Sequence, residues 1–203
     1  MMDKDIQKLF KEKNREILIT NLKYDLDKNI GSLMETITNI FNLTFDESIR
    51  KIETIFVDAN IMNSIKPITE VVNDMKLDSY SDLSSLITKK KSIILDNVKD
   101  LKFTEESMQT YYDMIIDTTK TIKENLKKSL SKTLENGNKE LCKLIINNND
   151  LVSNRLDDYL NNRLYEKIET KIHMEIMLRD NSLINKAKEG YLRYQEICSK
   201  TLV

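Results

Sequence analysis

Hydrophobic residues recur at every fourth position over one long stretch, residues 152–176, with mainly polar and charged residues between them. The series consists of Val152, Leu156, Leu160, Leu164, Ile168, Ile172 and Ile176. Positions four apart lie one above the other on a helix, so the spacing predicts a long α-helix. Each step exceeds a full α-helical turn by about 40°, so six steps carry the series about 240° around the axis. One straight neighbour cannot cover that series, so we expect different neighbours at the two ends.

Helical spacing also predicts two helices in the N-terminal third of the chain. The first covers residues 4–42, either as one long helix or as two in line, and contains apolar residues that alternate three and four positions apart, a spacing typical of coiled coils. These residues are Ile30, Leu33, Ile37 and Ile40. Thr44 and Glu47 have the spacing of a capping box, so a second helix is predicted to begin there. Pro67 ends that helix and is followed either by a loop or by a short helix that has Pro67 in its first turn.

The remaining sequence predicts further helical segments and several breaks. Polar residues at 78–82 indicate a turn, after which a helix runs to about residue 102. Thr104, followed by two glutamates, indicates the start of the next helix, and Gly137 indicates its end. The Asn-rich run at 147–150 is the clearest break in the chain and is expected to cap the start of the helix over residues 152–176, and residues 180–182 have the composition of another break.

Composition supports an all-α fold. Three glycines and one proline are too few for the many turns that a β-rich or α/β domain of this length requires. We therefore expect an elongated multi-helix bundle of long antiparallel helices with coiled-coil-like packing. The polar run near residue 77 divides an N-terminal helical pair (1–77) from a C-terminal helical bundle (78–203). A single domain over 1–203 fits the pattern nearly as well.

Charge and apolar run length limit the classes of partner. The chain has 32 basic and 33 acidic side chains and a net charge of −1, whereas a general nucleic-acid coat carries a clear positive excess. Its apolar runs are far shorter than the ~20 residues that span a bilayer. The two cysteines lack metal-ligand spacing, and nothing implies an oxidising compartment. We expect a cytoplasmic protein that is not inserted into a membrane.

Reactive side chains are scarce. His173 is the only histidine, which excludes the usual di-iron bundle with two Glu-x-x-His pairs. Glu169 lies one turn before it, and the pair is more simply explained as an ordinary helix contact than as a metal or acid–base site. Cys142 and Cys198 lie beside apolar positions and are best explained as core residues. We therefore expect no catalytic residue, no metal, no cofactor and no enzymatic activity.

Two surfaces are candidates for contact with a partner. The first, the lysine patch, consists of Lys120, Lys123, Lys127, Lys128 and Lys132 and suits an anionic partner, although a solvated helix face is the simpler explanation. The second, the C-terminal seam, consists of Ile184, Ala187, Tyr191, Tyr194 and Cys198 and keeps heptad spacing. Tyrosines on such a seam suit either a core or an interface whose rim stays wet.

These patterns favour a non-catalytic structural or adaptor protein that acts through helix–helix contacts with a protein partner or with itself, as a homo-oligomer. The alternative is a nucleic-acid-associated regulatory protein that uses the lysine patch. The first hypothesis depends on the apolar seams and on the scarcity of catalytic groups. The second depends on one local concentration of lysines in a chain that is otherwise balanced in charge.

Overall fold

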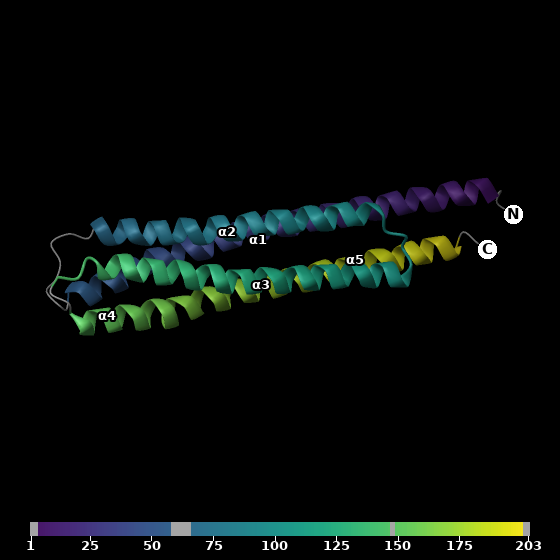
Figure 1. Cartoon of the computed structure of the whole chain (residues 1–203). Helices are drawn as coiled ribbons and strands as arrows, with labels where there is room; N and C mark the ends of the chain where they lie inside the picture. Colours follow the sequence, from purple (N-terminus) through teal and green to yellow (C-terminus); the bar gives the residue numbers. More distant parts are fainter. Residues whose placement is uncertain (1–3, 58–65, 147–148, 201–203) are drawn as a thin grey trace. The chain divides into compact units, whose positions relative to one another are not determined.

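The computed structural model describes residues 4–57, 66–146 and 149–200, and all regular structure within these ranges is helical (Figure 1). The elements are α1 (Lys4–Val57), α2 (Lys66–Lys99), α3 (Glu105–Cys142), α4 (Asp150–Asp157), the π-helix η1 (Asp158–Leu164) and α5 (Tyr165–Lys200). The prediction of an all-α bundle of long helices is confirmed. No helix in the described part of the chain is long and apolar enough to cross a membrane.

The chain divides into two compact units, each built from segments that are distant in sequence. Of the described residues, 4–33, 87–120 and 176–200 form the first unit, and the remainder form the second. Each of the four long helices contributes a segment to both units. Such units cannot be separated by cutting the chain at one position.

The core of the first unit is built by four helical segments. Its fully buried side chains include Leu18, Leu22 and Leu26 of α1, Ile94 and Val98 of α2, Met108, Tyr111 and Ile115 of α3, and Leu183 and Ala187 of α5. Five residues connect α2 to α3, and a short connection of this kind places consecutive helices antiparallel. Arg15 fastens this connection, because its Nε and Nη2 atoms donate hydrogen bonds of 3.3 and 3.0 Å to the carbonyl oxygen of Leu101.

The second unit buries aromatic and aliphatic side chains from every helix that enters it. They include Phe41, Phe45, Ile52 and Phe56 of α1, Ile68, Val72 and Met75 of α2, Leu126, Leu130, Leu134 and Leu141 of α3, and Val152 and Leu156 of α4. Within each helix, each of these positions follows the previous one by three, four or seven residues. The same helical periodicity that predicted the helices therefore also identifies the faces that they bury.

Because of the π-helix η1, the apolar series at residues 152–176 rotates less around the helix axis than expected. All seven members are buried, as the periodicity predicts. The middle of the series, however, lies in η1, where the Tyr165 amide donates to the Leu160 carbonyl five residues earlier. A π-helix takes more residues per turn than an α-helix, so a four-residue step there no longer exceeds a full turn. The drift of about 240° expected for an uninterrupted α-helix is therefore wrong.

Two predicted helix starts are confirmed by their hydrogen bonds. Thr104 precedes α3, where its Oγ1 accepts from the Ser107 amide at 3.2 Å and its own amide donates to Ser107 Oγ at 3.0 Å. Asn149 caps α4, accepting from the Val152 amide through its side chain. Pro67 lies in the first turn of α2, as one alternative predicted, but α2 is far longer than the short helix expected.

Four predicted boundaries are wrong because the helices continue through them. Thr44 does not begin a helix: it is buried inside α1. Residues 78–82 lie within α2, Gly137 lies within α3, and residues 180–182 lie within α5. In each case apolar side chains on both sides of the expected break are buried, and that burial outweighs a local capping preference. The boundary between 1–77 and 78–203 stays a prediction, although the turn on which it depended is absent.

Candidate functional site

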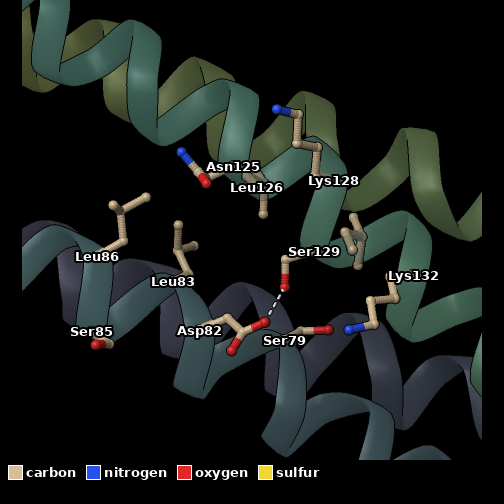
Figure 2. Close-up of a pocket in the computed structure, with 11 residues that line it drawn as sticks. Ser79, Asp82, Leu83, Ser85, Leu86, Asn125, Leu126, Lys128, Ser129 and Lys132 are labelled. Atoms are coloured by element: carbon tan, nitrogen blue, oxygen red, sulfur yellow. Dashed lines mark hydrogen bonds between the residues drawn. The ribbon is translucent and has the colours of Figure 1, made fainter.

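A groove of about 360 Å³ lies between α2 and α3 in the second unit (Figure 2). One end is polar and carries the side chains of Ser79, Asp82, Ser129 and Lys132. The other end is mainly apolar and carries Leu83, Leu86 and Leu126. On α2 these residues are 79, 82, 83 and 86, and on α3 they are 126, 129 and 132, so steps of three or four keep them along the edge that faces the other helix. The packing of α2 against α3 therefore creates both ends of the groove.

The polar end contains one buried hydroxyl group that lacks a partner. The Ser129 hydroxyl donates to Asp82 Oδ2 at 2.7 Å. Ser79 is only 2% exposed, and its Oγ atom has no hydrogen-bond partner among the described residues. An unpaired buried polar group costs roughly 1–3 kcal/mol. In Figure 2 the Ser79 hydroxyl points toward the ammonium group of Lys132, and both residues line the groove.

A second polar cluster surrounds His173, on α5 in the same unit. Its Nε2 atom lies 4.0 Å from Glu169 Oε1, one turn earlier on the helix. Burial lowers the pKa of His173, the positive charges of Lys123 and Lys127 on α3 lower it further, and Glu169 opposes them. Burial also raises the pKa of Tyr165, one turn before Glu169, to about 12.

The His173 cluster does not resemble a metal centre. Within residues 4–57, 66–146 and 149–200, no three His, Cys, Asp or Glu side chains are grouped so that they could hold a metal ion. Cys142 and Cys198 are both free thiols and partly buried. Burial and the two lysines instead favour the neutral form of the His173 imidazole group.

The five residues of the lysine patch do not share one face of α3. Lys128 and Lys132 line the α2/α3 groove. The positive charges of Lys123 and Lys127 lower the pKa of His173, which lies on α5. Lys120 is exposed and belongs to the first unit. A nucleic-acid backbone would therefore not meet these five charges as one continuous stripe.

The C-terminal seam faces the core of the first unit over most of its length. Ala187 is part of that core, and Ile184, Tyr191 and Tyr194 pack against it. The Tyr194 ring lies 5.6 Å from the ring of Phe103, measured between centroids. Cys198 is partly buried. The seam therefore contributes mainly to packing within the unit.

A different apolar surface is exposed on the N-terminal part of α1, and the sequence analysis did not distinguish it from the buried face. We call it the outer face of α1. It consists of Ile6, Phe10, Ile17 and Tyr24, all of which are exposed. The last three are seven residues apart, so the signal was present in the sequence. It was missed because Ile17 and Leu18 are adjacent and apolar, and only packing decides which of the two faces the core.

Comparison with known proteins adds no functional information, since no family model, curated protein or solved structure matches this chain. Function is therefore inferred from the described side chains and their surroundings.

Proposed function

We propose that this chain is a non-catalytic structural or adaptor protein that acts through helix–helix contacts, and that a second copy of the chain binds the outer face of α1. The observation that carries the proposal is the exposure of Phe10, Ile17 and Tyr24 at heptad spacing. A cytoplasmic location is part of the same proposal. The scarcity of histidine and glycine in the sequence agrees with a role in contact.

The outer face is separate from the face that α1 buries within its own unit. Leu22 follows Ile17 by five residues, which places the two side chains about 140° apart around the helix axis. Leu22 is buried, whereas Ile17 is 50% exposed. A helix with apolar residues on two faces gains further free energy of association when the second face is covered, at about 25 cal/mol per Å² of apolar surface.

Charge favours a second copy of the chain as the partner. Between residues 4 and 28 there are seven basic side chains, Lys4, Lys8, Lys11, Lys13, Arg15, Lys23 and Lys28, and five acidic ones, Asp5, Glu12, Glu16, Asp25 and Asp27. A helix that carries both signs along its length can pair opposite charges with a copy of itself. A strongly acidic or basic partner would meet repulsion over part of the same surface.

Sedimentation of the full chain over a wide concentration range tests the proposal. We expect concentration-dependent self-association in the wild type and its loss in Ile17→Lys, because the lysine places a charge in the interface. Ile116→Lys is the matched control, since Ile116 on α3 is 54% exposed and belongs to the same unit. A wild type that remains monomeric throughout, or a control that dissociates as fully as Ile17→Lys, would contradict the proposal.

The nucleic-acid alternative receives less support. Its lysine patch is divided between the groove and the surroundings of His173. One result would favour the nucleic-acid alternative: the chain binds DNA or RNA in a salt-dependent way, and binding is lost when Lys123, Lys127 and Lys128 are replaced with Gln.

A further inference from the structure

We propose that the α2/α3 groove binds a small amphipathic anion. The Ser79 hydroxyl and the Lys132 ammonium group would hold its carboxylate or phosphate head, and the leucines would take a short hydrocarbon tail. This site lies in the second unit, whereas the self-association surface belongs to the first. The two proposals can therefore succeed or fail separately.

The head is assigned to the polar end because two donors there lack acceptors. Ser79 Oγ is buried and has no partner in the described part of the chain. Lys132, likewise, forms no ion pair within that part, and in Figure 2 the Ser79 hydroxyl points toward its ammonium group. An anionic oxygen between them would accept a hydrogen bond from each. Hydrogen bonds of this kind to a charged acceptor are about twice as strong as neutral ones.

Charge around the groove favours an anion over a cation. Among the residues that line it, Lys128 and Lys132 are basic and only Asp82 is acidic. Asp82 Oδ2 already accepts a hydrogen bond from the Ser129 hydroxyl, which satisfies part of the hydrogen-bonding capacity of the carboxylate. The surplus positive charge therefore remains for a ligand.

The other end of the groove accounts for an apolar tail. Leu83, Leu86 and Leu126 line it, and in Figure 2 they lie on the side away from Ser79 and Lys132. A volume of about 360 Å³ is at the small end of the range for ligand pockets. It suits a short alkyl chain with one charged head, and it is too small for a large ligand.

Calorimetric titration of the full chain with octanoate, octyl phosphate, acetate and octylamine tests this proposal. Octanoate or octyl phosphate should bind and the tighter of the two identifies the head, whereas acetate should bind more weakly because it lacks the tail. Ser79→Ala and Lys132→Gln should each weaken binding of the preferred anion about tenfold. Lys127→Gln is the matched control, because it removes the same charge from the same helix outside the groove and should leave the affinity unchanged.

Three outcomes would overturn the proposal. In the first, neither octanoate nor octyl phosphate binds to the wild type. In the second, octylamine binds as tightly as the anions, which would mean that the leucines alone attract the ligand. In the third, Lys132→Gln or Ser79→Ala binds the preferred anion as tightly as Lys127→Gln does. Circular dichroism of each variant establishes that it is folded, and Lys132 is exposed, so its replacement leaves the core intact.

Discussion

The side chain of Met75 on α2 packs directly against Gly137 on α3. A Cβ atom on Gly137 would lie 2.6 Å from Met75 Cγ and closer still to Met75 Sδ. Both residues are buried in the second unit. A larger residue at position 137 would require the Met75 side chain to move, so this packing favours glycine inside the helix even though glycine normally ends helices.

Gly137→Ala is therefore expected to lower the free energy of unfolding by about 1 kcal/mol. Overpacking typically costs about 1–3 kcal/mol, and the better helix propensity of alanine returns up to about 1 kcal/mol. Urea denaturation measures the change. In a Met75→Ala background the same substitution should become neutral or stabilising, and an unchanged penalty there would contradict the packing argument.

Gly31→Ala is expected to have the opposite effect and to stabilise the fold. Gly31 is exposed on α1, and a Cβ atom there would meet nothing within 4 Å. Alanine should therefore raise the free energy of unfolding by about 1 kcal/mol through helix propensity alone. Urea denaturation at low protein concentration separates this effect from self-association. A destabilised Gly31→Ala variant would mean that the exposed glycine has a role that the described surroundings do not reveal.

Leucines buried in the π-helix should contribute as much to the free energy of unfolding as leucines buried in an ordinary α-helix. Leu160 and Leu164 are buried, and replacing either with alanine should cost about 2–5 kcal/mol of unfolding free energy. Leu151→Ala on α4 is the control, because Leu151 is 68% exposed and should change stability by at most about 0.5 kcal/mol. Chemical denaturation measures these changes. A similar loss of unfolding free energy in all three variants would mean that Leu160 and Leu164 do not face the core.

Phe103 combines backbone strain with burial, and burial should dominate. Its φ angle is +54°, a conformation that favours glycine, yet its ring is buried against Tyr194. Phe103→Gly relieves strain of roughly 1–3 kcal/mol but removes packing equivalent to roughly 3–5 kcal/mol. We expect a net destabilisation of roughly 2 kcal/mol by thermal and urea denaturation. A variant more stable than the wild type would mean that strain is the larger contribution.

Stability should fall as the pH decreases from about neutral, in part because of His173. Its pKa is lowered in the folded chain by burial and by Lys123 and Lys127, with Glu169 opposing. The unfolded histidine therefore binds a proton at a higher pH than the folded one, and stability is lost as the pH falls through 6.5 toward the folded pKa. His173→Gln should flatten this part of the curve of unfolding free energy against pH. An identical slope in wild type and variant would contradict the lowered pKa.

Patterns along the chain were enough to predict the all-α class, the buried face of residues 152–176 and the starts at Thr104 and Asn149. Each of these depends on residues that are close together in the chain. Helical spacing identifies a buried face without knowledge of its neighbour, and a cap is a hydrogen bond within one turn. The sequence also contained the outer face of α1, but it did not separate Ile17 from Leu18, because both suit a buried position.

Packing between the helices sets where each helix continues and which polar side chains line the same groove. A cap contributes about 1 kcal/mol, whereas burying one large apolar side chain contributes about 1.5–3 kcal/mol, so α1 and α3 run through Thr44 and Gly137. Ser79 and Lys132 are far apart in the chain and line the same groove only because α2 packs against α3. No pattern within either helix reveals the shared groove. The free energy that packs α2 against α3 comes from the leucines and methionines buried between the two helices.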